Sequence, residues 1–273
     1  MIRVINSKNL LGEGIYFKNE VLYWLDIERK AINFVNINKI NQIETVHLPE
    51  MVSVIFDVSD NWVTVGSESG IVDINLLDST WKVRTKEFRL DHTMRLNDGI
   101  QSQGIYLFGS MEKKPTGLNG SLYLSNGQDV KIIDQDIGIP NSFVQISESE
   151  FLISDSFEKI IYRYEIDFIK KEVIKKCVWN DFSSECFTPD GGDINSKNEI
   201  YIAMWGGSGI YKFDISGTLI GKIDIPALQP TNCCFSEDEK TIYVTSATTG
   251  LKENDINEYP LSGSVFLIDM ESI

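Results

Sequence analysis

Six turn-and-strand units follow one another along this 273-residue chain at nearly even spacing. Each unit places a polar residue after a turn and before short runs of β-forming residues, with gaps of 40 to 49 residues; these polar residues are Glu13, Ser53, Asn97, Asn141, Asp190 and Asn232. Several strands in a repeat of this length are typical of a β-propeller. Because equivalent positions of radial repeats meet near one axis, the pattern predicts a shared site rich in carboxylate and carboxamide oxygens, which suits a divalent cation.

The unit that begins at Asp190 shows the repeat most clearly. Its β-forming runs, separated by short turns, predict four strands: Asp190–Asn195, Glu199–Trp205, Ile210–Ile215 and Thr218–Ile225. Equivalent second strands are expected at Val21–Asp26, Trp62–Val65, Ile105–Phe108, Phe151–Ile153 and Thr241–Val244. The sequence therefore predicts an all-β fold, a six-bladed β-propeller of four-stranded antiparallel blades, as a single domain over residues 1–273.

Two further segments bear on how this propeller is built. The aromatic and β-branched residues of Phe157–Cys177 favour two long strands over a helix. Closure of the ring requires the first and last repeats to meet, so Ile2–Ile5 is expected to pair as an outer strand with Ser264–Ile268.

Charge and composition exclude several classes of function. The formal charge of −15 opposes binding to a nucleic-acid backbone. The chain has no apolar run near the ~18 residues that a membrane-spanning helix needs. It begins without a basic segment followed by an apolar one, so we expect a cytoplasmic protein. The oligomeric state does not follow from the sequence.

Cysteine and histidine chemistry is also unlike that of the common catalytic sites. The four cysteines form no C-x-x-C pattern, and we expect them to be buried thiols. With two histidines and no G-x-S-x-G sequence, a Ser-His-Asp triad is disfavoured. Carboxylate and amide chemistry remains. For any one of the polar residues, capping of a turn is the simpler interpretation, but their common place in the repeat favours a shared site.

The same residues carry a family resemblance over nearly the whole chain. The relevant motifs, in order, are Leu11-Gly-Glu-Gly14, Tyr23-Trp-Leu-Asp-Ile27, Arg95-Leu-Asn-Asp-Gly99, Gly109-Ser-Met111, Ile139-Pro-Asn141, Ser154-Asp-Ser156, Ile161-Tyr-Arg-Tyr164, Pro189-Asp-Gly191, Trp205-Gly-Gly207, Pro230-Thr231 and Tyr243-Val-Thr-Ser246. In this order and spacing the chain resembles the SMP-30/gluconolactonase/regucalcin-like family of six-bladed propellers. Ser142 and Ile100 depart from the family, which usually has Gly and Lys at these positions.

The resemblance implies a site, a cofactor and an activity. It implies one divalent metal ion held by Glu13, Asn141 and Asp190, most often calcium, with zinc, manganese and magnesium as alternatives. It also implies that Arg95 and Asn97 face the substrate, and that the activity is hydrolysis of sugar-derived lactones.

Chemistry suggests the roles within such a site. A bound cation polarises the lactone carbonyl, and Asp190 is our choice as the general base that takes a proton from water. The sequence leaves two other functions open, namely a non-catalytic calcium- or small-ligand-binding propeller and a hydrolase of other esters. It also leaves open whether Trp205 stacks on a sugar or packs between blades, and whether Asp155 caps a turn or lines the channel mouth. No role is assigned to Glu112.

Overall fold

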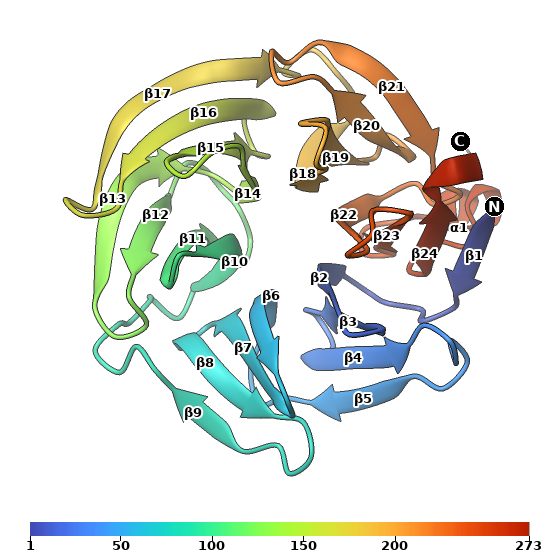
Figure 1. Ribbon diagram of the computed structural model, residues 1–273, viewed down its shortest axis with the longest axis horizontal. Coiled ribbons are helices and arrows are strands. Elements are labelled where there is room, and N and C mark those ends of the chain that lie inside the picture. Colours follow the sequence, from blue (N-terminus) through green and yellow to red (C-terminus); the bar gives the residue numbers. More distant parts are fainter. Residues whose placement is uncertain (273) are drawn as a thin grey trace. The chain divides into compact units, whose positions relative to one another are not determined.

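The computed structural model describes residues 1–272, which form six four-stranded antiparallel sheets (Figure 1). This is the predicted six-bladed β-propeller. Each sheet runs from a buried first strand to an exposed fourth strand, as the sheet that contains Asp190 illustrates. There β19 (Ile200–Trp205) is almost wholly buried, whereas β21 (Leu219–Asp224) is largely exposed. The near-continuous apolar sequence of β19 is therefore that of a strand covered on both faces.

Two compact units divide the chain: Met1–Pro49 with Glu185–Ile273, called here the first unit, and Glu50–Ser184, called the second unit. The sheets of the first unit are β2 (Gly12–Lys18), β3 (Val21–Asp26), β4 (Ala31–Asn36) and β5 (Glu44–His47); β18 (Thr188–Ile194), β19, β20 (Gly209–Phe213) and β21; and β22 (Pro230–Phe235), β23 (Thr241–Ser246), β24 (Val265–Asp269) and β1 (Ile2–Ile5). A single domain over residues 1–273 stays a prediction.

The second unit contains the other three sheets in chain order. They are β6 (Val52–Ser59), β7 (Trp62–Ser67), β8 (Gly70–Asn75) and β9 (Trp81–Val83); β10 (Met94–Ser102), β11 (Ile105–Glu112), β12 (Gly120–Ser125) and β13 (Val130–Ile137); and β14 (Pro140–Gln145), β15 (Glu150–Asp155), β16 (Ile160–Asp167) and β17 (Glu172–Asp181). The two long strands predicted between Phe157 and Cys177 are β16 and the first part of β17. Two short helices that the sequence did not predict, α1 (Glu253–Glu258) and η1 (Met270–Ser272), lie in the first unit.

The N-terminal strand completes the last sheet, as expected. β1 pairs antiparallel with β24, from Ile2 opposite Ile268 to Ile5 opposite Val265. The first and last strands of the chain therefore share one ladder of backbone hydrogen bonds, and the edge of β24 is covered rather than left open to another chain.

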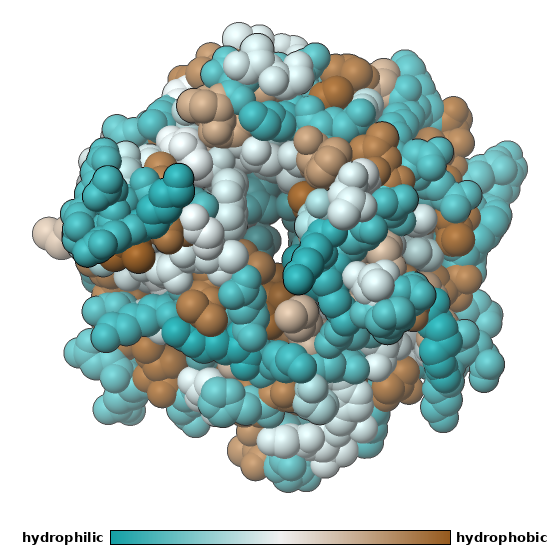
Figure 2. All heavy atoms as spheres, turned by 180° about the vertical axis from the view of Figure 1, so that it is seen from behind, coloured by the Kyte–Doolittle hydropathy of each residue, from teal (hydrophilic) through white to brown (hydrophobic). Residues whose placement is uncertain are grey.

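The hydrophobic core lies between neighbouring sheets. In the first unit, Ile210 of β20 and Ile223 of β21 belong to one cluster with Val244 of β23 and Phe266 of β24. Hydrophilic residues predominate on the face shown in Figure 2, where hydrophobic residues are scattered. In the described part of the chain, no helix has the length and apolar character to cross a membrane.

The expectation that all four cysteines are buried was wrong for two of them. Cys177, on the outer strand β17, and Cys186, in a turn, are exposed, whereas Cys233 of β22 is buried. The outer strand of a blade has one open edge and a solvent-facing side, so β-forming residues there need not be covered. Each cysteine is a free thiol, and burial raises the pKa of Cys233 well above its usual value.

Candidate functional site

A break in strand register recurs at the predicted polar residue in the first strand of every sheet. The breaks fall between Glu13 and Tyr16, Val52 and Val54, Leu96 and Gly99, Asn141 and Val144, Pro189 and Gly192, and Pro230 and Asn232. A bulge of this kind leaves residues out of the hydrogen-bond ladder and turns their side chains to a new direction. The six polar residues thus lie in or next to a register break as well as at one repeat position, with Ser53, Asn97 and Asp190 inside the break and the other three at its edge.

The second unit links three predicted site residues and one neighbouring serine in a row of hydrogen bonds. Arg95 Nη1 donates to Asn97 Oδ1 at 2.6 Å, and Asn97 Nδ2 donates to Asn141 Oδ1 at 2.7 Å. Asn141 Nδ2 in turn donates to Ser156 Oγ at 2.9 Å. Arg95, Asn97, Asn141 and Ser156 each have 9% or less of their surface exposed. Arg95, Asn97 and Asn141 therefore lie together within this unit, while their roles at a metal or substrate stay a prediction.

Arg95 determines the donor-to-acceptor direction of this row of hydrogen bonds. A guanidinium group only donates, so Asn97 must present its oxygen to Arg95 and its amide nitrogen to Asn141. Both N–H groups of Asn97 are then used, because Nδ2 also donates to the carbonyl oxygen of Pro140 at 2.9 Å. Asn141 must accept from Asn97 and donate to Ser156. The Asn141 oxygen keeps a second lone pair, which could coordinate a hard cation.

Asp98, which the sequence analysis did not single out, holds the bulge that follows Asn141. Its buried carboxylate accepts from the backbone N–H of Gly99 at 2.8 Å and from the backbone N–H of Ser142. Ser142 has a φ of 73°, the left-handed conformation for which the family's glycine is suited. Burial raises the pKa of Asp98 to about 7, against the smaller opposing effect of these two hydrogen bonds. Its only signal in the sequence is its place beside Asn97.

The first unit holds Glu13, Asp190 and Asn232 in one neighbourhood. Asn232 Nδ2 donates to Glu13 Oε2 at 3.4 Å, and the backbone N–H of Gly14 donates to the same oxygen at 3.2 Å. A Cβ at Gly191 would overlap the side chain of Asn232, so the absence of a side chain there lets the amide lie against the residue that follows Asp190. Asp190 itself is buried in β18.

The predicted metal ligands differ from the His- and Cys-rich clusters that commonly bind zinc. Within residues 1–272, no group of three or more His, Cys, Asp and Glu side chains is placed to hold a metal ion. The predicted set contains two carboxylates and one carboxamide, Asn141. Because Glu13 and Asp190 lie in one unit and Asn141 in the other, the joint grip of a cation by these three residues stays a prediction.

Asp155 caps a turn, which was one of the two roles considered for it. Its carboxylate is 2% exposed and accepts from the backbone N–H groups of Gly138, Ile139 and Phe157 at 2.8 to 3.0 Å. Asp26 occupies the corresponding place in β3 and accepts from three backbone N–H groups of the first unit. In each of these two sheets, the aspartate at the end of the second strand therefore holds the segment that leads into the first strand.

Trp205 and Glu112 have local partners. Trp205 is partly buried, and its indole N–H donates to Gln229 at 3.2 Å when the glutamine amide is oriented with its oxygen inward. Glu112 accepts from the backbone N–H and the hydroxyl of Thr116, which shapes the loop after Met111. Stacking of Trp205 on a sugar stays a prediction.

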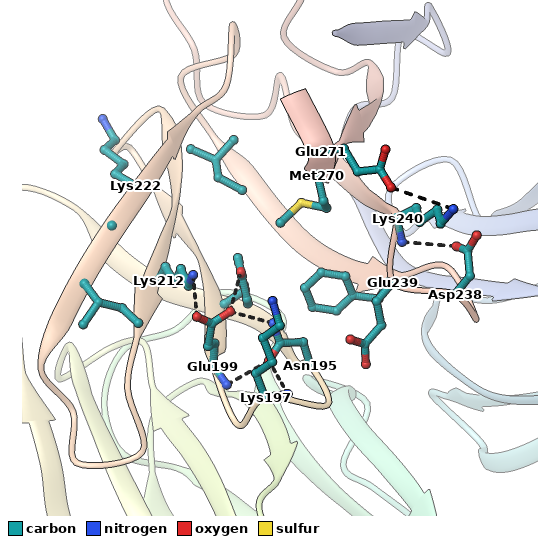
Figure 3. A pocket seen from close by; sticks show the side chains of 15 residues that line it. Asn195, Lys197, Glu199, Lys212, Lys222, Asp238, Glu239, Lys240, Met270 and Glu271 are labelled. Atoms are coloured by element: carbon teal, nitrogen blue, oxygen red, sulfur yellow. Dashed lines mark hydrogen bonds and ion pairs between the residues drawn. The ribbon is translucent and has the colours of Figure 1, made fainter. Parts of the chain in front are cut away.

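A cavity of about 590 Å³ lies in the first unit, away from the predicted residues (Figure 3). Residues of β19 to β22, of the turns that follow β18 and β22, and of η1 line it. Its charged groups largely satisfy one another: Lys212 pairs with Glu199 at 2.7 Å, and Lys240 pairs with Glu271 at 3.8 Å. None of Glu13, Arg95, Asn97, Asn141 and Asp190 contributes to its walls.

Comparison with known proteins agrees with the resemblance seen in the sequence. The pentonolactonase XacC of Haloferax volcanii is 26% identical over 98% of this chain and 94% of its own length. The 6-deoxy-6-sulfogluconolactonase of Pseudomonas putida is 23% identical over 96% of this chain and 92% of its own length. A crystal structure described as a calcium-binding protein, regucalcin, from Agrobacterium tumefaciens superimposes with a TM-score of 0.88 at 23% identity, covering 97% of this chain and 92% of that one.

The family match covers most of the propeller. The sequence profile of the SMP-30/Gluconolactonase/LRE-like region matches residues 11–248, which include Glu13, Arg95, Asn97, Asn141 and Asp190. The chain therefore belongs to the SMP-30/gluconolactonase/LRE-like family.

Proposed function

We propose that this protein is a divalent-metal-dependent hydrolase that opens sugar-derived lactones. The observation that carries the proposal is the buried chain from Arg95 through Asn97 to Asn141, at bulges of two neighbouring first strands. A guanidinium and two amides in such a position hold a polar surface open to a ligand, where packing alone would favour apolar side chains. The lactonase names of two relatives support the choice of substrate class.

Glu13, Asn141 and Asp190 are the proposed metal ligands, with calcium the first candidate and zinc, manganese and magnesium as alternatives. Two carboxylates and an amide oxygen are ligands that calcium prefers. Asn141 fits this role because Ser156 accepts one of its N–H groups, which fixes the amide so that its oxygen is available. The regucalcin structure, described as a calcium-binding protein, supports the choice of cation.

The proposed mechanism assigns one task to each residue. A bound cation supplies positive charge that polarises a carbonyl and lowers the pKa of a nearby water. Asp190 accepts a proton from the water that attacks the lactone carbonyl carbon. When the ring C–O bond breaks, that proton passes to the ring oxygen, which leaves a carboxylic acid and a new hydroxyl. Arg95 donates to substrate oxygens, and Asn97 offers the second lone pair of its amide oxygen to a substrate hydroxyl.

A panel of aldonolactones in a pH-indicator assay, with and without chelator, tests this function. We expect chelator-sensitive acid release that is lost in Asp190→Asn. The matched control is Asp193→Asn, which removes a partly buried carboxylate of the same strand. The oxygens of that carboxylate accept from the backbone N–H groups of Ile194 and Phe235. Loss of activity in both variants to the same degree would contradict a special role for Asp190.

Metal binding is measured separately by calorimetry. Glu13→Gln and Asn141→Ala should each weaken binding of calcium. If both variants bind calcium as the parent does, the ligand set is wrong.

A second candidate function is binding without catalysis, which the calcium-binding description of the regucalcin structure favours. Calcium binding without turnover of any lactone would support it. Turnover of an aryl ester but of no aldonolactone would instead indicate a hydrolase of other esters.

A further inference from the structure

Ser53 has an unusual hydroxyl for a buried residue. Its Oγ is the one buried side-chain oxygen or nitrogen in residues 1–272 that has no hydrogen-bond partner, and only 3% of the residue is exposed. Buried polar groups in folded proteins are nearly always paired, so such an exception calls for a partner outside the chain. A hydroxyl can both donate and accept, and its partner can be of either kind.

The position of Ser53 in the fold indicates where that partner lies. Ser53 belongs to β6 and falls in the register break between Val52 and Val54, the counterpart of the break that contains Asn97 in β10. β6 and β10 pack against each other within the second unit. Ser53 therefore occupies the same repeat position as Asn97 on the adjacent first strand.

The residues beside Ser53 and Asn97 support this placement. Val54 and Leu96 belong to the same buried hydrophobic cluster. Ser53 precedes Val54 and Asn97 follows Leu96, so both polar residues lie beside this cluster at the register breaks of their strands. The unpaired hydroxyl thus belongs to β6, which packs against the strand that carries Arg95 and Asn97.

We propose that Ser53 is a specificity residue, whose Oγ hydrogen-bonds a hydroxyl of a polyhydroxylated substrate. This inference rests on the proposed function and names the part of the substrate that the site recognises. Ser53 carries no charge and lacks the acidity of a general base, so it has no part in the bond-breaking step. Its contribution is to distinguish a sugar lactone from a lactone without hydroxyl groups.

Ser53→Ala separates this role from a structural one. We expect KM for an aldonolactone to rise about tenfold, the effect of one lost hydrogen bond, while kcat/KM for unsubstituted γ-butyrolactone stays as in the parent. Thermal stability should be equal or higher, because the substitution removes a hydroxyl that has no partner in the folded chain.

Ser67→Ala is the matched control in β7. The Ser67 hydroxyl is buried but paired, since it donates to the carbonyl oxygen of Gly70 at 3.1 Å and accepts from the N–H of Ser69. This variant should lose stability and affect both lactones alike. If Ser53→Ala changes both substrates equally, or neither, the specificity role is overturned while lactone hydrolysis stands.

If the parent protein turns over no lactone, the proposed function is wrong, and Ser53 is then tested by calorimetry with the aldonate product as the ligand. Weaker aldonate binding by Ser53→Ala than by the parent would still support recognition of a polyol by Ser53. Equal binding by the two proteins, or no binding by the parent, would overturn the inference as well.

Discussion

Replacing Asn97 by alanine tests the polar chain of the second unit through the stability of the fold. The substitution removes one bond that Asn97 accepts from Arg95 and two that it donates, to Asn141 and to the carbonyl of Pro140. It leaves those partners buried and lacking a bond each. At about 1 kcal/mol for each bond, we expect the free energy of unfolding to fall by about 3 kcal/mol.

Urea unfolding at pH 7 measures this change as a lower midpoint with an unchanged slope. Asn97→Asp serves as the shape-matched variant, because it keeps an acceptor for Arg95 but sets a carboxylate oxygen against the Asn141 and Pro140 oxygens that the amide donated to. It should therefore also lose stability, although it fills the same space as asparagine. Asn232→Ala removes two bonds in the first unit, the long one to Glu13 and the one that Asn232 accepts from the backbone N–H of Cys233, and should cost about 2 kcal/mol. A free energy for Asn97→Ala that lies within about 0.5 kcal/mol of the parent would refute the reasoning.

Three further predictions concern neighbouring features. Gly191→Ala should push the Asn232 amide away from Glu13 and weaken calcium binding about tenfold, or roughly 1.4 kcal/mol, in calorimetry; unchanged affinity would show that the amide does not support the carboxylate. Asp155→Ala should lower the free energy of unfolding by about 3 kcal/mol in urea, because it removes the carboxylate that accepts from three backbone N–H groups; a loss below about 1 kcal/mol would contradict the capping role. The folded-state pKa of Asp98, about 7, lies above its ordinary value of 3.8. The contribution of Asp98 to stability is therefore complete below about pH 4 and is lost as the pH rises through 7, on the order of 4 kcal/mol in total. Asp98→Asn should remove that decline from urea titrations between pH 5 and pH 8, and an unchanged pH profile would show that the group titrates elsewhere.

Much of the fold follows from local sequence. Runs such as Ile200–Trp205 are rich in β-formers and sit between turn residues, so strand and turn are readable from neighbours in the chain. The pairing of Ile2–Ile5 with the last strand was also predictable, because a closed ring of blades needs a partner for its final edge. The exposure of Cys177 was missed, because the expectation treated all four cysteines alike, although the charged residues of β17 distinguish this outer strand from an inner strand such as β19.

The candidate site likewise contains residues that the sequence identified and residues whose role only the structure shows. Repeat spacing and family motifs singled out Arg95, Asn97 and Asn141, which the second unit does bring together. The motifs also contain Ser156, which fixes the Asn141 amide, and Asp98, which holds the following bulge, but the sequence assigned no role to either. Their roles depend on contacts across about 15 and 44 residues of chain, from Asn141 to Ser156 and from Asp98 to Ser142, and no local pattern encodes such contacts.

The amino-acid sequence by itself determined the repeat, the strand content and the residue types at the turn positions, because these depend on interactions between near neighbours. Only the tertiary structure decided the direction of the amide chain, the raised pKa of Asp98 and the unpaired hydroxyl of Ser53. Each of these depends on which groups packing brings within hydrogen-bond distance and which it removes from water.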